Sequence, residues 1–471
     1  MSCRLIDSAL TIWQSGVNAV LPERLIETRL AFSGEPAGSP VVTVCGEAFP
    51  LRAGARVIVV GMGKASGAMA AGAEKALAPL IEAGRLSGWV NLPANALTPL
   101  RVVHAHAGRS ARMNEPTDTG VAGTREIARL IESAGPDDLI LALISGGGSA
   151  LAPLPIPEIT LEKKALVTRL LSGAGANIVE LNTVRKQLSR IKGGGMCRMA
   201  RGRRLVALIL SDVLGDPLDV IASGATVADT STPADALNVL RRFGLADRAD
   251  LSDVVAALRK RSRTLTPDSP ADAGYENHRN LIVGNNRLAV DAACRRAEQL
   301  GFRAVGESAP RSEEDVGEVA ERLIGAIERQ RAAGTPTALI SGGEPTVTLA
   351  PPEIRGEGGR NTQLVLLALI EALRNRKRFP ARFIFLSAGT DGEDGPTDAA
   401  GAYFDDGFVG RGDGSAEEIL AAACDAARRN DAYTFFQRFG GLFRPGATGT
   451  NVCDLRVLLV GAELAEGNRS R

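Results

Sequence analysis

Short apolar runs and amphipathic segments alternate along most of this chain. Leu139–Ile144 is apolar at every position and is followed directly by Ser145-Gly146-Gly147-Gly148-Ser149. An apolar run this short, bounded by glycines, is typical of a strand that is buried on both faces. Comparable runs predict further buried strands at Arg56–Val60, Leu205–Leu210 and Phe383–Leu386. Because segments with helical spacing of apolar residues separate these runs, the sequence predicts the α/β class with a doubly wound parallel sheet.

A polar segment that contains two prolines, 264–274 (TLTPDSPADAG), interrupts this alternation. Its composition is typical of a linker, and the alternation of strands and helices resumes at Asn280. The chain has 471 residues, which is more than a single hydrophobic core usually organises. We therefore expect two domains, residues 1–265 and residues 275–471.

Composition argues against several classes of function. The net charge of +1 and the aromatic content of 4% give no support for a nucleic-acid partner. The six cysteines are scattered and lack a CxxC pair, so neither a zinc site nor a disulfide framework is expected. No apolar stretch approaches the ~18 residues of a membrane span, and the N-terminus does not resemble a signal peptide. We therefore expect a cytoplasmic protein that has no membrane partner.

Glycine-rich turns at the ends of predicted strands are the first candidates for chemistry. Backbone N–H groups exposed at Ser145–Ser149 are suited to bind an anion such as a phosphate. A second turn, Gly61–Lys64 (GMGK), opens a predicted helix. A lysine is disfavoured at the positive end of a helix dipole, so Lys64 indicates that an anion binds nearby. In each case a tight turn without a ligand is the alternative.

Three further segments predict contacts to an anionic substrate. Asn182–Lys192 predicts a helix that carries Arg185, and Gly358–Gln363 is a glycine turn that leads into a helix with Arg360 at its start. Either arginine can bind a carboxylate or a phosphate through two parallel hydrogen bonds. A solvated basic face is the alternative for the first segment. Leu339–Leu349 (LISGGEPTVTL) partly repeats the glycine motif and predicts another turn at a strand end.

Acidic residues also follow predicted strands. Asp212 comes after Leu205–Leu210, and Asp391 and Asp394 lie in a glycine-rich loop after Phe383–Leu386. Carboxylates at such strand ends can hold Mg²⁺ or orient a hydroxyl group. The alternative is a set of turns without chemistry, because Asp-Gly pairs are also common in turns.

Eight segments of the chain together resemble the class II glycerate 2-kinases, whose C-terminal part is the MOFRL domain. In order, the segments are VVGMGKAS (59–66), LISGGGSAL (143–151), LNTVRKQLSRIKGGG (181–195), LSDVLGDPLDVIASGATV (210–227), LISGGEPTV (339–347), GEGGRNTQLVLLALI (356–370), SAGTDGEDGPTDAAGA (387–402) and TGTNVCDL (448–455). The resemblance implies a Rossmann-like N-terminal domain, a second α/β domain with the MOFRL region at about 335–460, and an active site in the cleft between the domains.

The resemblance also implies an activity, namely the ATP- and Mg²⁺-dependent phosphorylation of D-glycerate at its 2-hydroxyl to give 2-phosphoglycerate. Lys64 would neutralise the transferring phosphoryl group or bind glycerate, and Asp212 would orient or deprotonate the hydroxyl. The carboxylate of glycerate would bind to Arg360, which we also count as catalytic, or to Arg185. Asp391 and Asp394 would hold Mg²⁺. The nucleotide would bind to Ser145, Gly146, Gly147, Gly148, Ser149, Gly342, Gly343, Glu344 and Asn361.

Two other classes of function stay open. An NAD(P)H-dependent hydroxypyruvate reductase, a name that some members of the family carry, needs a dinucleotide site. The spacing Gly61-x-Gly63-x-x-x-Gly67 and the lack of an acidic residue after the next strand argue against one. A sugar- or nucleotide-binding regulator would not need an acid, a base and phosphate loops from both halves. The residues alone distinguish neither C2 from C3 phosphorylation nor a monomer from a homodimer.

Overall fold

The computed structural model describes residues 2–110, 115–263, 274–331, 335–375, 382–411 and 414–461. Internal contacts divide the chain into two units. The N-unit comprises residues 22–211 and 216–283, and the C-unit comprises residues 1–21, 212–215 and 284–471. Residues 264–273 of the predicted linker (264–274) lie outside the described residues.

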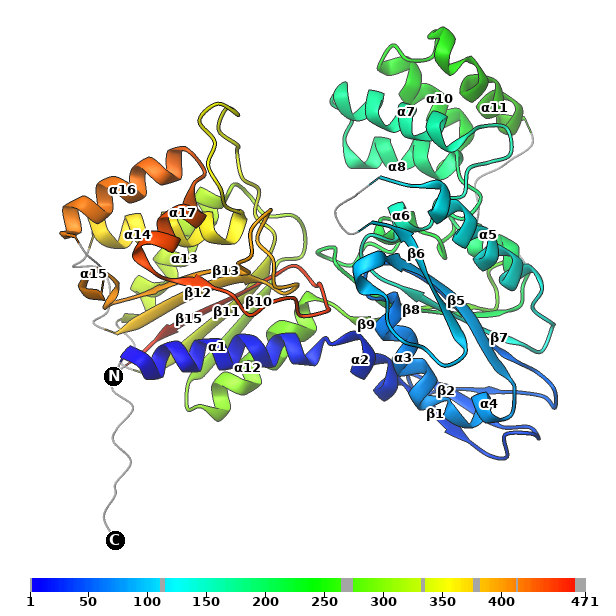
Figure 1. Ribbon diagram of the computed structural model, residues 1–471, viewed down its shortest axis with the longest axis horizontal. Coiled ribbons are helices and arrows are strands. Elements are labelled where there is room, and N and C mark those ends of the chain that lie inside the picture. Colours follow the sequence, from blue (N-terminus) through cyan, green and yellow to red (C-terminus); the bar gives the residue numbers. More distant parts are fainter. Residues whose placement is uncertain are drawn as a thin grey trace. The chain divides into compact units, whose positions relative to one another are not determined.

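The N-unit is built on a six-stranded sheet with the order β6-β5-β4-β7-β8-β9 (Figure 1). The strands are β4 (Val57–Met62), β5 (Leu86–Pro93), β6 (Val103–Arg109), β7 (Leu139–Ile144), β8 (Arg204–Leu210) and β9 (His278–Gly284). Strands β4 and β7 are buried at every position, as their apolar runs predict. The ladders that join β6, β5, β4, β7 and β8 are parallel, which confirms the predicted fold class. The order reverses between β4 and β7, and ligands of open α/β sheets bind beyond the carboxyl ends of such strands.

The helices of this unit form two groups (Figure 1). Helices α3 and α5 pack on the strands β4 and β5, whereas α7, α8, α10 and α11 enclose a hydrophobic core of their own. A small antiparallel sheet, β1-β2-β3, completes the unit. The remaining elements of the N-unit are α2 (Pro22–Arg29), β1 (Leu30–Ser33), β2 (Val41–Val44), β3 (Glu47–Pro50), α3 (Ser66–Ala76), α4 (Ala78–Glu82), α5 (Asp118–Glu132), α6 (Gly148–Leu151), α7 (Leu161–Gly173), α8 (Ile178–Gln187), α9 (Gly195–Ala200), α10 (Pro233–Arg242) and α11 (Ser252–Ser262).

The C-unit contains a mixed six-stranded sheet with the order β10-β11-β15-β12-β13-β14. The strands are β10 (Arg303–Ser308), β11 (Thr337–Gly343), β12 (Phe383–Gly389), β13 (Gly401–Asp405), β14 (Leu442–Phe443) and β15 (Asp454–Val460). Only β10 and β11 form a parallel pair among these ladders, and β15 runs antiparallel to both of its neighbours. The last strand of the chain therefore lies in the middle of the sheet and is buried at every position.

Both faces of this sheet are covered by helices (Figure 1). On β15, Leu455, Val457 and Leu459 belong to the core that includes α1 and α12, while Leu458 and Val460 belong to the core on the opposite face. Helix α1 comes first in the chain, yet its apolar residues pack with the C-terminal half. The helices are α1 (Ser2–Ala19), α12 (Asn286–Gln299), α13 (Val316–Arg331), α14 (Arg360–Arg374), α15 (Phe408–Arg411), α16 (Ala416–Arg428) and α17 (Ala432–Phe439). None of the described helices is long and apolar enough to span a membrane.

Candidate active site

Two glycine turns of the N-unit, Gly61–Lys64 and Ser145–Ser149, are joined by hydrogen bonds at the ends of β4 and β7. The Lys64 N–H donates to the Gly146 carbonyl at 2.8 Å, and the Ala65 N–H donates to Ser145 Oγ at 3.0 Å. Gly63 has φ of +131°, and a Cβ at this position would lie 2.2 Å from Ser145 Oγ. Only glycine allows this close approach, so the structure brings Lys64 and the Ser145–Ser149 turn together.

The exposed side of this turn is basic. Gly147 adopts a left-handed conformation (φ 76°) and is exposed. A Cβ on Gly147 would lie 3.5 Å from Lys64 Cγ and 3.7 Å from Arg109 Nη2. Lys64 is exposed, whereas Arg109 is buried at the end of β6, and this burial lowers its pKa. Two cations from separate strand ends therefore flank the glycine turn.

Three further basic residues, the buried Lys164 and Lys192 and the half-buried Arg185, lie close together, and one of them contacts the turn. Lys192 Nζ donates to the Ser149 carbonyl at 2.8 Å. Burial, followed by the positive charges of Lys164 and Arg185, lowers the pKa of Lys192 well below its ordinary value. Burial and then the charge of Arg185 lower the pKa of Lys164 to about 7, and its Nζ has no hydrogen-bond partner. No carboxylate of the described residues forms an ion pair with any of the three cations.

The backbone that carries Lys192 is tied to a loop in an uncommon conformation. The N–H groups of Gly193, Gly194 and Met196 donate to consecutive carbonyls of the loop, namely those of Ser223 at 3.0 Å, Gly224 at 2.8 Å and Ala225 at 3.0 Å. Ala222 and Ser223 have φ of 49° and 57°, and Ser223 Oγ lies 2.7 Å from Ser149 Oγ. Non-glycine residues in the left-handed region store strain and cluster at functional sites.

Arg360 of the C-unit is held by two carboxylates. Its Nε and Nη2 donate to Asp454 at 2.7 and 3.1 Å, and its Nη1 donates to Glu344 at 2.6 Å. Burial opposes the positive charge, but the charges of Asp454 and Glu344 raise the pKa of Arg360 above its ordinary value. Three of the five N–H groups of the guanidinium are thereby engaged.

Asp212 lies in the same region of the C-unit. Its carbonyl accepts a hydrogen bond from Cys453 Sγ at 3.2 Å. Burial and then the charges of Glu344, Asp454 and Asp212 raise the pKa of Cys453 well above its ordinary value. Two predicted catalytic residues, Asp212 and Arg360, are therefore close to one buried thiol. Cys453 itself has φ of 68°, so this non-glycine residue is also in the left-handed region.

The sequence predicts a glycine turn at Gly342 and Gly343, and this prediction is wrong. Both residues belong to β11 and pair with Leu455 and Asp454 of β15. A Cβ on Gly342 would lie 1.8 Å from Asn286 Oδ1. These two glycines leave room for polar side chains, so packing explains their presence in the second copy of the LISGG motif.

Asn361 is also engaged inside the C-unit. Its Nδ2 donates to Asp454 at 2.9 Å, and its Oδ1 accepts from Ser387 Oγ at 2.6 Å. The side chain is buried. These contacts favour a structural role for Asn361, in place of the nucleotide contact that the sequence predicts.

Both halves of this chain match known protein families. Residues 8–259 match a family described as a domain of unknown function (DUF4147), and residues 337–454 match the MOFRL family. The glycerate kinase of Mus musculus is 36% identical, and the match covers 97% of this chain and 93% of that protein. The chain belongs to the glycerate kinase family.

Other relatives extend this finding. The crystal structure of glycerate kinase from Thermotoga maritima superposes with a TM-score of 0.78 at 32% identity, and the match covers 96% of this chain and 99% of that one. A relative in Agrobacterium vitis is 35% identical, with 93% of this chain and 94% of that protein covered, and carries the provisional name hydroxypyruvate reductase. Membership of the glycerate kinase family confirms the resemblance seen in the sequence.

The predicted metal pair fits Mg²⁺ poorly in this member of the glycerate kinase family. Asp394 is buried, and its two oxygens accept from Asn361 N at 2.9 Å and Thr362 N at 2.8 Å, at the start of α14. Burial raises the pKa of Asp394, although these N–H groups oppose the change. Asp394 thus caps a helix, which leaves Asp391, a half-buried residue, as the candidate ligand of the pair. Among the residues that the structure describes, no group of three or more His, Cys, Asp or Glu side chains is arranged to hold a metal ion.

The sequence analysis did not select four residues that the structure places at these sites. They are Arg109, Lys164, Lys192 and Asp454, and each is buried. The signal was weak, because Lys164 lies in an ordinary amphipathic helix and Asp454 opens a strand that is otherwise apolar except for Arg456. Burial of a charge, which depends on the tertiary structure, is what marks these residues.

Proposed function

We propose that this member of the glycerate kinase family transfers the γ-phosphoryl group of ATP to the 2-hydroxyl of D-glycerate. The names and the coverage of its relatives support glycerate as the acceptor. The single observation that carries the proposal is the cluster of Lys164, Arg185 and Lys192 beside the glycine turn. Buried cations without a carboxylate are costly, and a bound anion offsets that cost.

The cluster favours Arg185 over Arg360 for the carboxylate of glycerate. Arg360 already binds Asp454 and Glu344, so an incoming carboxylate would meet two negative charges. Arg185 has two cationic neighbours, and its pKa is lowered by burial. A carboxylate that binds at Arg185 removes repulsion, whereas a carboxylate at Arg360 adds it.

The glycine turn is the proposed site of the nucleotide phosphates. Gly147 is exposed, and the side chains of Lys64 and Arg109 lie next to it. Backbone N–H groups and cations in this arrangement neutralise the charge that accumulates during phosphoryl transfer. We assign Lys64 to the transferring group because its exposed side chain is free to reach a substrate.

In the proposed reaction the 2-hydroxyl oxygen attacks the γ-phosphorus, and the bond to the β–γ bridging oxygen breaks. ADP leaves with that electron pair, and the hydroxyl proton passes to a base, for which Asp212 is the proposed residue. Mg²⁺, when bound to the nucleotide, neutralises phosphate charge. The proposal needs side chains of both units in one reaction, and this part stays a prediction.

A split assay tests the proposal. One reaction contains D-glycerate, ATP and Mg²⁺, and phosphorus NMR resolves the product. The other contains hydroxypyruvate with NADH or NADPH, and absorbance follows oxidation of the nicotinamide. We expect 2-phosphoglycerate in the first reaction, whose chemical shift and coupling distinguish it from the 3-phosphate. Nicotinamide oxidation without a phosphorylated product would overturn the proposal and assign the chain to the reductase class.

A further inference from the structure

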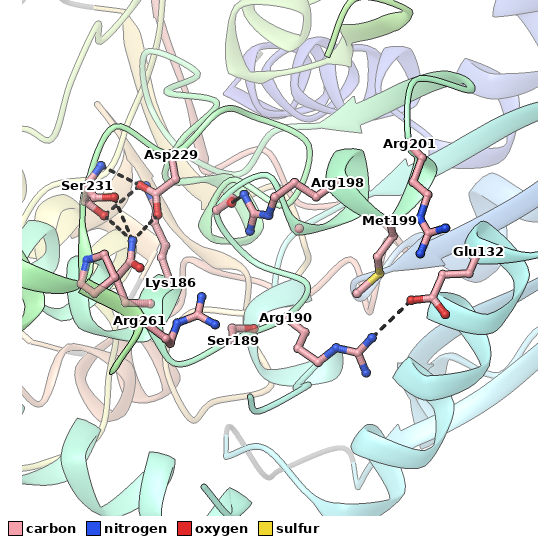
Figure 2. Close-up of a pocket in the computed structure, with 14 residues that line it drawn as sticks. Glu132, Lys186, Ser189, Arg190, Arg198, Met199, Arg201, Asp229, Ser231 and Arg261 are labelled. Atoms are coloured by element: carbon pink, nitrogen blue, oxygen red, sulfur yellow. Dashed lines mark hydrogen bonds and ion pairs between the residues drawn. The ribbon is translucent and has the colours of Figure 1, made fainter. Parts of the chain in front are cut away.

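Two basic residues of α8 and of the turn that follows it are balanced by carboxylates. Lys186 Nζ lies 3.8 Å from Asp229 Oδ1, and Arg190 pairs with Glu132 at 3.2 Å. Figure 2 shows the pocket that these four residues line, with the ion pair between Arg190 and Glu132 as a dashed line. These two positive charges therefore have counter-charges within the protein.

Three cations nearby lack such a partner. Lys164 and Lys192 are buried, and Arg185 is half-buried. None of the three forms an ion pair with a carboxylate of the residues that the structure describes, and Lys164 Nζ has no hydrogen-bond partner among them. Burial and then the charges of the other two residues lower the pKa of Lys192, so the three groups lie close enough to repel one another. When all three are protonated, their charges are left unbalanced.

The cluster also reaches the turn that we propose for the nucleotide phosphates. Lys192 Nζ donates to the carbonyl of Ser149, the last residue of that turn, at 2.8 Å. Lys164 and Arg185 come from α7 and α8, which share a hydrophobic core. A phosphoryl group that passes from the turn to the acceptor therefore stays next to these cations.

The substrate and the product of the proposed reaction differ in charge. At neutral pH D-glycerate carries a single negative charge, on its carboxylate. A phosphate ester adds about −1.5 to −2, which brings 2-phosphoglycerate to about −2.5 to −3. Its carboxylate and its phosphate are attached to the same carbon atom, C2, so both can face one cluster of cations. The substrate leaves positive charge unbalanced there, whereas the product balances it.

We propose that the cluster of Lys164, Arg185 and Lys192 binds 2-phosphoglycerate more tightly than D-glycerate, so that the product inhibits the enzyme in competition with its substrate. This inference rests on the proposed function and adds a regulation of the same site. Contacts between opposite charges contribute more in a desolvated site than in water. Accumulated product slows the reaction, and a second reaction that consumes the phosphorylated acid restores the rate.

Titration calorimetry without nucleotide, at constant ionic strength, tests the inference. The ligands are D-glycerate, 2-phosphoglycerate and 3-phosphoglycerate, and the variants are Lys164→Met and the control Arg190→Gln. Arg190 is exposed and paired with Glu132, outside the cluster. We expect wild type and R190Q to bind 2-phosphoglycerate at least about tenfold more tightly than D-glycerate, and K164M to lose most of this preference. K164M should fold, because methionine replaces an unpartnered buried amine with an apolar side chain.

Two results of this titration would overturn the inference. One is equal affinity of the wild type for product and substrate, and the other is an unchanged preference in K164M. The 3-phosphate places the same charge one carbon atom farther from the carboxylate, so we expect it to bind more weakly than the 2-phosphate. Equal binding of the two phosphates would mean that the anionic groups do not share one cluster, and this would also contradict the inference.

Initial rates with ATP, D-glycerate and added 2-phosphoglycerate give a second measurement. We expect competitive inhibition against D-glycerate, with an inhibition constant about tenfold below the KM of D-glycerate. A wild-type enzyme that phosphorylates D-glycerate without inhibition by the product would contradict this inference alone. An enzyme that transfers no phosphoryl group would contradict the proposed function instead.

Discussion

At the scale of single residues, burial of charge distinguishes the candidate site from ordinary turns. Lys164 is buried in α7 without a hydrogen-bond partner for its Nζ, and Lys192 is buried against the Ser149 carbonyl. Burial lowers the pKa of both lysines, and the positive charges of their neighbours in the cluster lower it further. A protein bears such a cost at a functional site, where a ligand of opposite charge offsets it.

Lys164→Met should reduce the proton uptake that we expect when glycerate binds. The pKa of Lys164 is about 7, so at about pH 8 most of the ligand-free protein carries a neutral amine. A carboxylate favours the ammonium form, so binding takes up a proton and weakens as the pH rises above about 7. Calorimetry with D-glycerate in two buffers of different ionisation enthalpy should show uptake of up to about one proton in wild type.

The control is Lys163→Met, because Lys163 is the adjacent residue and pairs with Asp253 at 3.6 Å. Proton uptake should persist in K163M, and equal uptake in K164M and wild type would contradict the prediction. The free energy of unfolding should respond to pH in the opposite direction to glycerate binding. Without ligand, the free energy of unfolding should rise between about pH 7 and pH 10, since the unfolded chain binds more protons there than the folded chain.

Lys64→Ala should lower kcat/KM for phosphoryl transfer about a thousandfold, because the variant loses a charge that stabilises the transition state. Lys75→Ala is the matched control, since Lys75 lies on α3, the helix that follows Lys64, and pairs with Glu23. Steady-state kinetics with ATP and D-glycerate measure both variants. A value of kcat/KM for K64A within about tenfold of wild type would place Lys64 outside the reaction centre.

At the scale of elements, the C-unit shows how glycines and a carboxylate set the start of α14. A Cβ on Gly359 would lie 2.3 Å from Asp394 Oδ1, so glycine is required before the helix. Asp394 then accepts from the first N–H groups of α14, which are unpaired at the start of any helix. The segments GEGGRN and DGED are distant in sequence and form one capping arrangement.

Asp394→Asn should destabilise the C-unit. It should not raise the Mg²⁺ concentration that is needed for activity. The new amide places a donor against the backbone N–H of Asn361 or Thr362, which costs about 2 kcal/mol of unfolding free energy. Urea unfolding measures this loss. Asp391→Asn is the comparison, because Asp391 is the remaining candidate for Mg²⁺, and it should raise the Mg²⁺ concentration needed for activity. A stable D394N enzyme with a raised Mg²⁺ requirement would restore Asp394 as a ligand.

At the scale of the whole molecule, the order of the chain differs from the order of the packing. Helix α1 precedes the N-unit in sequence, but Trp13 contacts Phe443 edge-to-face at 4.9 Å and its Nε1 donates to the Ala388 carbonyl at 3.4 Å. Gly16 allows close contact with α12 and β15, since a Cβ there would lie 2.5 Å from Leu455 Cδ2. The C-unit core is therefore completed by the first residues of the chain.

Ile12→Ala should destabilise the C-unit by about 2–5 kcal/mol, because Ile12 is fully buried in the core shared by α1, α12 and β15. The chain has two tryptophans, Trp13 in the C-unit and Trp89 in the N-unit. In a Trp89→Phe background, Trp13 fluorescence reports unfolding of the C-unit. Gln14→Ala is the control, since Gln14 is exposed on the same helix. An equal loss of unfolding free energy in the Ile12→Ala and Gln14→Ala variants would show that the buried face of α1 does not stabilise the core of the C-unit.

Local sequence patterns were enough to predict the α/β class, the buried strands β4, β7, β8 and β12, and the two glycine turns that carry Lys64 and Ser145–Ser149. These features depend on local patterns, because apolar runs and glycines act through neighbouring residues. The family also followed from short segments whose residues and order are enough to identify it. Arg185 was likewise predicted to bind the substrate carboxylate from its place in a short basic segment.

The burial of charged side chains and the identity of their partners depend on contacts that form in the folded chain. In the tertiary structure, Lys164 and Lys192 lie near Arg185. Arg360 forms ion pairs with Asp454 and Glu344. Asp394 caps the start of α14. The tertiary structure also puts Gly342 in a strand and places α1 with the C-unit. Each of these outcomes joins residues that are far apart in the chain, and the energy of a charge depends on the solvent and partners that such contacts leave it.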